Sequence, residues 1–467
     1  MPETSALSRR SSMTIGRRPV IVVAILAVLV IWWQAKVLPF GDPFYGLFQN
    51  ATDLRVYRAG ARTVLDGRPL YTNSVLWNLD FTYPPFAALV MTPFALLEVA
   101  TAKAVWFAAT FVALCAVIVL SFRSLGYRID RSLLIFSVFA TVAATALEPV
   151  RTTVWLGQVN IFLMLLVLAD LVLLDMIRPG SRLRGIGVGI AAGIKLTPAF
   201  FVVYLLFVRR WRAAATAVVA FGCTVALAFV VIPSDSWRFW TVDASGAPAR
   251  IGRVDSPANQ SINGFISQLL AYFDIRRFAH PMPGGPVFEA PLWMWLPVAL
   301  VAAALGLWAA VVAQRNGRAL LAVTIVGMTG STVSPFSWGH HWVWFVPLLV
   351  IAFDEAYRSR TLWVWLAPAG IVALSFTYWY NWWDSGPRWT ADHAIALGLF
   401  MMPRWPDPQW FDYPLVVLYA GCYPLVLLIT IVVTLVAGAR RRPATVTEAT
   451  TATSVIVVDG PDRPVAA

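Results

Sequence analysis

The sequence predicts an all-α polytopic membrane protein. Hydrophobic residues make up 59% of its 467 residues and charged residues only 13%, and several uncharged runs reach the roughly 20 residues that a helix needs to cross a bilayer. The net charge of +12 comes from Lys and Arg residues in short clusters between the apolar runs, which is typical of topology signals. We therefore expect membrane lipids as partners and no nucleic acid.

The apolar runs give the expected membrane helices in chain order. The first run follows four arginines and is not closed by a small-residue cleavage site, so we interpret it as a retained helix rather than a signal peptide. Basic connectors separate most of the later runs. The expected helices cover residues 19–38, 100–121, 132–147, 160–177, 213–232, 291–314, 319–336, 342–356, 361–380 and 414–437.

Two further apolar regions do not fit a single span. Residues 85–98 are too short to cross comfortably and contain Pro93, so we expect a re-entrant or interfacial helix. Residues 184–208 are longer than one span but are interrupted by Lys195 and Pro198, which predicts two half-helices that meet there. Irregular backbone at membrane depth normally lines a cavity.

The basic connectors set the orientation. They all become cytoplasmic in one arrangement, with both termini inside and about 12 crossings, or 10 in the alternative. The expected outer segments are 41–99, 148–159, 233–290 and 381–413. Residues 1–18 and the Thr-, Ala- and Pro-rich residues 438–467 are expected to be disordered, which leaves 19–437 as the membrane domain.

The sequence lacks the usual signatures of a bound metal or nucleotide. Cys115, Cys223 and Cys422 lie far apart within apolar segments and without metal-ligand spacing, so we expect neither a disulfide framework nor a zinc site. No paired-Asp motif for a divalent metal and no Gly-rich phosphate loop is evident. No cytoplasmic segment is long enough for a nucleotide-binding domain. We therefore expect no cofactor, and any activated substrate should be borne by the membrane.

Asp53 is the first notable polar residue of the outer segments. It lies just after the first helix, at the start of an amphipathic segment, where it either caps a helix or acts as a general base. Partial desolvation near the bilayer surface would raise the pKa of this carboxylate and suit it to take a proton from a sugar hydroxyl.

Two other outer motifs carry polar groups next to apolar runs. The segment TYPPF, which contains Tyr83, is expected to be extended and rigid because Pro fixes φ and restricts the residue before it. The segment EPVRTTVWLGQVN supplies Glu148, Arg151, Gln158 and Asn160. It is either a simple polar connector or a set of sugar contacts, since carboxamides beside hydrocarbon need partners.

Three further sites have both a structural and a functional interpretation. Lys195 in GIKLTP either extends to an interface or binds an anion inside a cavity. Asn259 in NQSING precedes an amphipathic run and also matches a glycosylation sequon. His340 and His341 in SPFSWGHHWVW are either packed interfacial histidines or ligands for an anion. A metal pair is disfavoured because adjacent helical residues point about 100° apart.

Together these groups suit the transfer of a sugar from a lipid-linked phosphate. A base must deprotonate the acceptor hydroxyl, and cations or hydrogen-bond donors must stabilise the leaving phosphate. A lipid flippase or transporter also uses intramembrane lysine and broken helices, but it does not need a carboxylate base at the outer mouth. A non-catalytic scaffold does not account for so many polar groups on one side.

The motifs DLRVYRAG, TYPPFAALVMTPF, EPVRTTVWLGQVN, GIKLTP, NQSING and SPFSWGHHWVW occur in this order. In order and spacing they resemble the actinobacterial polyprenyl-phosphate-mannose-dependent α-(1→2)-mannosyltransferases of glycosyltransferase family 87, which belong to the GT-C membrane superfamily. The resemblance implies a GT-C-type fold at the plasma membrane. It also implies an inverting transfer of mannose from a β-linked polyprenyl phosphate to a phosphatidylinositol mannoside or lipomannan acceptor on the outer face.

The resemblance also implies roles for single residues. The family's catalytic Asp matches Asp53, and its histidine pair matches His340 and His341, of which we favour His341. Arg55 departs from the His expected in the phosphatidylinositol mannoside enzymes, which leaves the acceptor open. An arabinofuranosyltransferase of the same family is the alternative activity. The expected donor-phosphate ligands are His341, His340, Lys195, Arg151 and Arg55, and the expected sugar contacts are Glu148, Gln158, Asn160, Asn259 and Tyr83.

Overall fold

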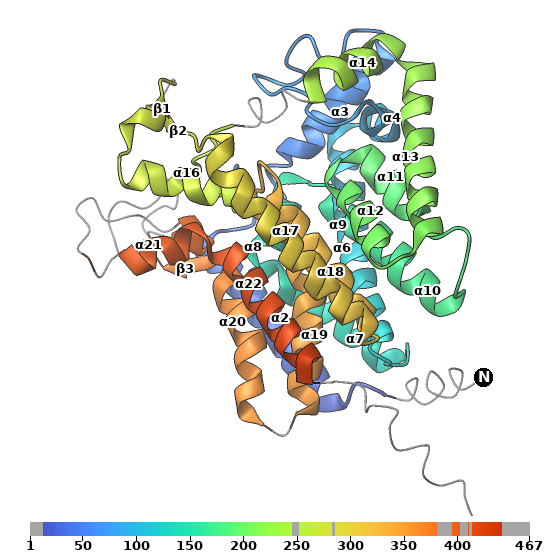
Figure 1. Ribbon diagram of the computed structural model, residues 1–467, viewed down its shortest axis with the longest axis vertical. Coiled ribbons are helices and arrows are strands. Elements are labelled where there is room, and N and C mark those ends of the chain that lie inside the picture. Colours follow the sequence, from blue (N-terminus) through green and yellow to red (C-terminus); the bar gives the residue numbers. More distant parts are fainter. Residues whose placement is uncertain are drawn as a thin grey trace, which may run out of the picture.

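The structure is a computed structural model that describes residues 13–244, 252–282, 285–359, 361–380, 395–401, 410 and 413–440. These residues form a bundle of helices with two short hairpins at its edge (Figure 1). Most of the two expected disordered tails, and most of the expected outer segment 381–413, lie outside the described residues.

The described part of the chain has six helices that are long and apolar enough to cross a membrane. They are α2 (Arg17–Val37), α6 (Val99–Ser124), the continuous segment Asn160–Ile177, α13 (Trp211–Val231), α17 (Leu292–Arg315) and α22 (Cys422–Arg440). The segment Asn160–Ile177 consists of α9 (Asn160–Leu168), a π-helical turn and α10 (Leu174–Ile177). The all-α membrane class is confirmed, while 12 crossings and their sidedness remain predictions.

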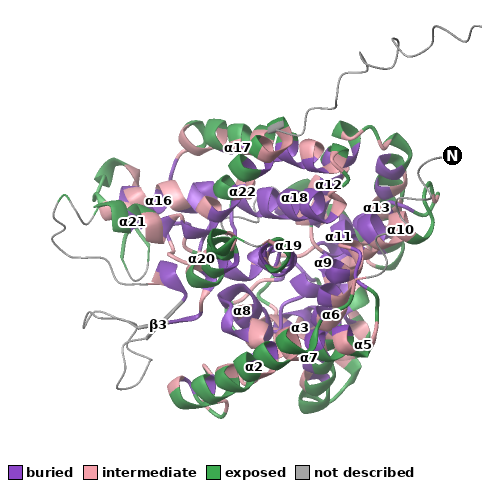
Figure 2. Cartoon of the chain, turned by 90° about the horizontal axis from the view of Figure 1, so that it is seen from below, coloured by how far each residue is buried: buried purple, intermediate pink, exposed green. Residues whose placement is uncertain are grey.

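Shorter helices complete the bundle. They are α7 (Arg131–Ala143), α18 (Ala319–Val333), α19 (Phe345–Arg358), α20 (Leu366–Ser375) and α21 (Tyr413–Ala420). Helix α18 is central, because every residue from Leu320 to Thr332 is buried. Helix α2 lies at the rim, where Ile21, Val22 and Ile25 are all more than half exposed, as Figure 2 shows by colour. An exposed apolar face of this kind is suited to lipid.

Residues 186–207 form the two half-helices that the sequence predicts. Helix α11 (Ile186–Ile194) ends at Lys195, and α12 (Phe200–Phe207) follows after a 3-10 turn over Thr197–Ala199. Each half-helix rises only about 12 to 14 Å, less than half of the roughly 30 Å hydrocarbon core. Glycines bring α11 close to α13: a Cβ at Gly193 would lie 2.2 Å from Oγ1 of Thr224. The break at Lys195 therefore lies inside the bundle.

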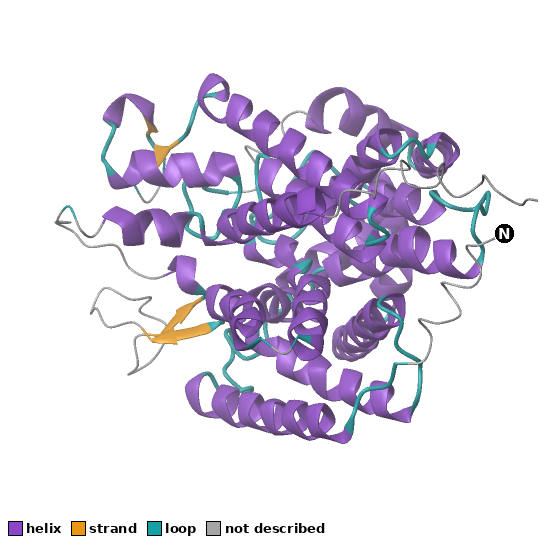
Figure 3. Cartoon of the chain, turned by 60° about the horizontal axis from the view of Figure 1, so that its bottom comes forward, coloured by secondary structure: helices purple, strands orange, loops and turns teal. Residues whose placement is uncertain are grey.

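Most of the short elements lie along the upper and left side of the bundle in Figure 1, called here the site end, and Figure 3 shows the strands at one edge of the molecule. The helices are α3 (Thr52–Leu65), α4 (Pro85–Val90), α5 (Thr92–Leu96), α8 (Glu148–Leu156), α14 (Pro233–Arg238) and α16 (Ile262–Tyr272). Strand β1 (Ala279–His280) pairs antiparallel with β2 (Val287–Phe288), and β3 (Tyr378–Tyr380) with β4 (Ile395–Leu397). Helices α4 and α5 correspond to the short region 85–98, whereas α8 lies where the sequence analysis expected a connector.

Candidate active site

Asp53 lies in the first turn of α3, but its side chain does not cap the helix. The residue before the helix is Ala51 in the left-handed conformation, with φ of 50°, and Oδ1 of Asn50 accepts the backbone N–H of Thr52 at 2.8 Å. Asp53 Oδ2 instead accepts a hydrogen bond from Nε2 of Gln158 at 2.7 Å. The carboxylate is thereby directed at the junction of α8 and α9.

Two tyrosines fix the amide of Gln158. The hydroxyl of Tyr57, one turn after Asp53 on α3, donates to Oε1 of Gln158 at 2.9 Å. Nε2 of Gln158 also lies 3.2 Å from the hydroxyl of Tyr83, and the two tyrosine rings meet edge-on at 4.9 Å. Since Oε1 accepts, Nε2 must be the end that faces Asp53. Gln158 therefore orients the carboxylate.

Burial raises the pKa of Asp53 from its ordinary value of 3.8 to about 6. The hydrogen bond from Gln158 and the positive charge of Lys195 act in the opposite direction and limit this rise. A carboxylate with this pKa is mostly ionised at neutral pH and is a stronger proton acceptor than an exposed aspartate. These properties are those of a general base.

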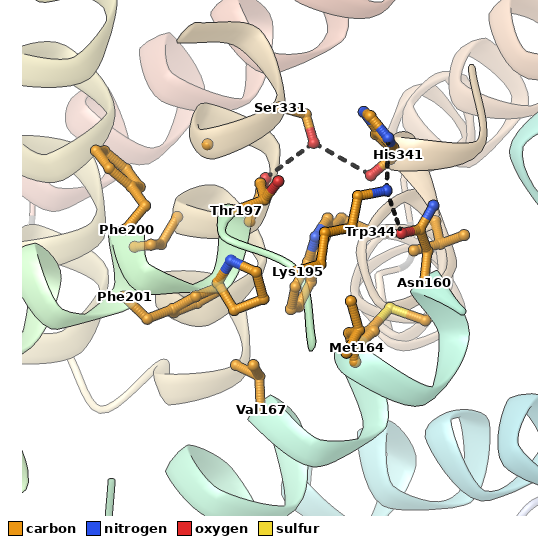
Figure 4. A pocket seen from close by; sticks show the side chains of 16 residues that line it. Asn160, Met164, Val167, Lys195, Thr197, Phe200, Phe201, Ser331, His341 and Trp344 are labelled. Carbon is orange, nitrogen blue, oxygen red and sulfur yellow. Dashed lines mark hydrogen bonds between the residues drawn. The ribbon is translucent and has the colours of Figure 1, made fainter. Parts of the chain in front are cut away.

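Lys195 forms a second polar cluster with Asn160 and His341. Its ammonium group donates to Oδ1 of Asn160 at 3.0 Å and lies 2.8 Å from Nε2 of His341. Figure 4 shows these three side chains pointing toward one another. An ammonium has three protons to donate, and these are its two hydrogen-bond partners among the described residues, so a third proton is left for a ligand.

The two adjacent histidines have different surroundings. Burial, together with the charge of Lys195, holds the pKa of His341 well below its ordinary value, so its Nε2 accepts from Lys195 and its proton sits on Nδ1. His340 is 4% exposed, and its backbone carbonyl accepts from Nδ2 of Asn160 at 2.8 Å. Nδ1 of His340 has no partner in the described part of the chain. The structure thus brings the His341 side chain to the lysine.

The two clusters share one pattern of burial. Asp53, Tyr83, Lys195 and His341 are partly exposed, whereas the side chains that hold them are buried. The buried supports are Tyr57, Gln158, Asn160 and His340. The clusters are electrostatically linked, since the charge of Lys195 acts on Asp53, and the Lys195 ammonium lies 5.8 Å from the Tyr83 ring centre. The partly exposed groups are those able to meet a ligand.

An apolar cavity leads away from the lysine cluster (Figure 4). Its polar end is formed by Lys195, Asn160, His341, Ser331 and Thr197. The remaining lining is mostly hydrophobic and comes from α9, α12, α18 and the segment after His341; it includes Leu163, Met164, Val167, Phe200, Phe201, Val326, Val343 and Trp344. A cavity with a lysine ammonium at its polar end and an otherwise apolar lining suits an anionic group attached to a lipid chain.

Two expected arginine ligands contact groups outside the Lys195 cluster. Arg151 is 1% exposed and donates from Nε to the Tyr378 hydroxyl at 3.1 Å and from Nη2 to the Tyr45 carbonyl at 2.6 Å. Arg55 lies with its guanidinium 6.0 Å from the ring of Trp77. Residues two apart on a helix point in nearly opposite directions, so Arg55 does not share the face of Asp53.

Two expected sugar contacts are also enclosed by protein. Asn259 is fully buried; its Oδ1 accepts the backbone N–H of Ser337 at 2.9 Å, and its Nδ2 donates to the Val254 carbonyl at 2.9 Å. Glu148 is 3% exposed and is bonded to Thr152 and Tyr423. Tyr57, Ser331 and Tyr423 were not among the site residues that the sequence predicts. Of these, Tyr57 could have been found, because it lies one helical turn after Asp53.

The fold and these clusters place a buried carboxylate beside an apolar cavity that has a lysine at its polar end, an arrangement that fits the class of membrane-embedded transferases. Residues 81–335 match glycosyltransferase family 87. The chain is 34% identical over 372 residues, 74% of its length and 82% of the relative, to the polyprenol-phosphate-mannose-dependent alpha-(1-2)-phosphatidylinositol mannoside mannosyltransferase of Mycobacterium tuberculosis. The chain therefore belongs to glycosyltransferase family 87 and is a glycosyltransferase, which confirms the resemblance.

Other relatives carry related names. The phosphatidylinositol mannoside enzyme of Mycolicibacterium smegmatis is 34% identical over 405 residues, 79% of this chain and 84% of that protein. A polyprenol-phosphate-mannose-dependent alpha-(1-2)-phosphatidylinositol pentamannoside mannosyltransferase of the same organism is 33% identical over 380 residues, 79% of this chain and 82% of that protein. No solved structure matches this chain.

Proposed function

We propose that this protein transfers mannose from a polyprenyl-phosphate donor to a phosphatidylinositol mannoside or related lipoglycan and forms an α-(1→2) linkage. The names of the relatives support this donor and this acceptor class. The observation that carries the proposal is the Lys195, Asn160 and His341 cluster at the head of an apolar cavity, beside the partly buried Asp53. The site end then faces the outside of the plasma membrane, and both termini face the cytoplasm.

In the proposed reaction Asp53 removes the proton of the acceptor hydroxyl. The acceptor oxygen attacks C1 of the mannose from the face opposite the phosphate, and the bond between C1 and the phosphate oxygen breaks. The bonding electrons leave with the polyprenyl phosphate, and the configuration at C1 is inverted. Gln158 keeps the carboxylate aimed at the hydroxyl, a geometric requirement of general-base catalysis.

The leaving phosphate gains negative charge as the bond breaks. The third ammonium proton of Lys195 and the Nδ1–H of His341 are donors that can stabilise this charge. The part of the polyprenyl chain next to the phosphate occupies the apolar cavity, and Tyr83 contacts the sugar between the two clusters. Because the base and the phosphate ligands come from the protein, we propose that transfer requires no metal.

A reconstituted assay tests this function. The purified protein in detergent is given labelled polyprenyl-phosphate mannose with a panel of phosphatidylinositol mannosides and lipomannan fragments, with and without EDTA. We expect a mannosylated product, with an α-(1→2) linkage by glycosidase digestion, and no effect of EDTA. If sugar is transferred only from polyprenyl-phosphate arabinose, the proposed mannose donor is wrong. If no product forms and the protein instead transports lipid-linked sugar in vesicles, the proposed transferase activity is wrong.

The pH dependence of kcat/KM should show the titration of Asp53. Only the ionised carboxylate accepts a proton, so activity falls as pH drops through the Asp53 pKa of about 6, rather than near 4 as for an exposed aspartate. Burial also raises the pKa of Glu148 to about 7, so the same profile is measured in Glu148→Gln. We expect the acid limb to persist there, and its loss would assign the limb to Glu148.

A further inference from the structure

Glu148 is a buried carboxylate that the proposed reaction does not use. It is the first residue of α8, and both of its oxygens are occupied within the protein. Oε1 accepts the hydroxyl of Thr152 at 2.7 Å, and Oε2 accepts the hydroxyl of Tyr423, at the start of α22, at 2.7 Å. With 3% exposure it has no surface to offer a sugar.

The carboxylate instead lies directly against the turn that carries the histidines. That turn is a 3-10 helix over Gly339–Trp342. A Cβ atom added at Gly339 would lie 2.2 Å from Oε1 and 2.2 Å from Oε2 of Glu148, so either the turn or the carboxylate, which is bonded to Thr152 and Tyr423, would have to move. Glycine at position 339 thus allows the turn to rest on the carboxylate.

Tyr423 holds the other end of the same turn. Its ring lies 5.5 Å from that of Trp342 and 4.9 Å from that of Phe345, and Trp342 is fully buried. The hydroxyl of Tyr423 is bonded to Glu148, while its ring packs on the residue that follows His341. The turn is therefore fixed on both sides of the histidine pair.

The opposite end of α8 holds the base. Helix α8 ends at Gly157, with φ of 69°, where a Cβ would lie 2.8 Å from Cβ of Leu54. Gln158 follows and bonds Asp53. One helix of about 13 Å therefore connects the support of the histidine turn to the support of the carboxylate base.

We propose that Glu148, held by Tyr423, is a positioning residue that keeps the His340–His341 turn against Lys195, and that it does not contact sugar. This inference rests on the proposed function, in which His341 and Lys195 bind the donor phosphate. The hydrogen bond between Lys195 and His341 measures 2.8 Å and weakens steeply with displacement, so a small shift of the turn separates the two phosphate ligands.

Four variants test this role: Glu148→Gln, Glu148→Ala, Gly339→Ala and the double variant Gly339→Ala/Glu148→Ala. Each is assayed for binding of polyprenyl-phosphate mannose and for the KM of the acceptor. We expect Glu148→Ala and Gly339→Ala each to weaken donor binding about tenfold or more and to leave the acceptor KM unchanged. Glu148→Gln keeps the size and the hydroxyl partners, so its donor affinity should stay within about threefold of the parent.

The double variant gives the sharpest result. Removing the carboxylate makes room for the methyl group of Ala at position 339, so donor binding should be better than in Gly339→Ala alone. Controls of the same chemistry are Glu289→Ala, at an exposed glutamate, and Gly370→Ala, where an added Cβ meets no atom within 4 Å. Thermal unfolding and size exclusion identify any variant that fails to fold. If Glu148→Ala or Gly339→Ala fails to fold, the donor affinities of Glu148→Gln and of the double variant still decide the test.

Other results would overturn the inference. A raised acceptor KM in Glu148→Gln with unchanged donor affinity would show a sugar contact. Equal donor binding in Gly339→Ala and the double variant would show that the two residues do not act on each other. His341→Ala distinguishes a failure of the proposed phosphate site from a failure of the positioning role. Unchanged donor binding in His341→Ala would refute the phosphate site itself. Weakened donor binding in His341→Ala, together with normal donor binding in Glu148→Ala and Gly339→Ala, would refute the positioning role alone.

Discussion

Replacing Asp53 by Asn is expected to abolish sugar transfer while leaving the fold intact. The amide has nearly the size of the carboxylate and still offers an oxygen to Nε2 of Gln158, which bonds Asp53 at 2.7 Å, so α3 and α8 should stay in place. It cannot accept the proton of the acceptor hydroxyl. General-base catalysis contributes roughly 10²- to 10⁴-fold, and we expect a loss in kcat of this order.

The measurement is the initial rate of transfer in detergent, together with donor affinity and thermal unfolding. Donor affinity should change little, because the proposed phosphate ligands Lys195 and His341 remain. The matched control is Asp66→Asn, at the end of the same helix, where the carboxylate is paired with Arg62 at the surface. Turnover of Asp53→Asn above about a tenth of the parent rate would rule out Asp53 as the base.

Much of the architecture could be predicted because the bilayer imposes simple rules. A run of apolar residues must satisfy its backbone internally and therefore forms a helix, which places α2, α6, α13 and α17 within a few residues of the expected bounds. The same rule locates the break at Lys195, since a charged residue beside Pro198 is costly in a continuous apolar helix. Helix α8 was missed because nine residues with an acid, a proline and an arginine resemble a connector.

The site could be predicted only in part, because the sequence shows which residues share a segment and not the direction in which each side chain points. Asp53 and Arg55 share a segment but point to different sides of α3. Asn259 lies in a polar motif, yet its amide is used to join two backbone segments. One of the two hydrogen-bond partners of Glu148 is Tyr423, 275 positions away, and no local pattern indicates such a contact. Only tertiary packing brings these residues together.

Replacing Lys195 by Met is expected to weaken donor binding strongly. Methionine keeps an apolar stem of similar length in the cavity but has no proton to donate. Oδ1 of Asn160 and Nε2 of His341 then lose their shared donor, and the proposed phosphate site loses the positive charge of Lys195. Removing one partner from a buried charged contact costs about 2 kcal/mol or more, so we expect the Kd for polyprenyl-phosphate mannose to rise about thirtyfold or more at an unchanged acceptor KM.

Lys195→Met should also move the pH profile. The charge of Lys195 lowers the pKa of Asp53, so its removal raises that pKa and shifts the acid limb of kcat/KM to higher pH. A lysine that merely extends to an interface would change neither quantity. The matched control is Lys103→Met. In the parent protein the ammonium group of Lys103 donates to the backbone carbonyl of Gln49 at 2.9 Å, away from the cavity. Unchanged donor affinity together with an unmoved acid limb in Lys195→Met would remove Lys195 from the site, because both effects require its charge to act there.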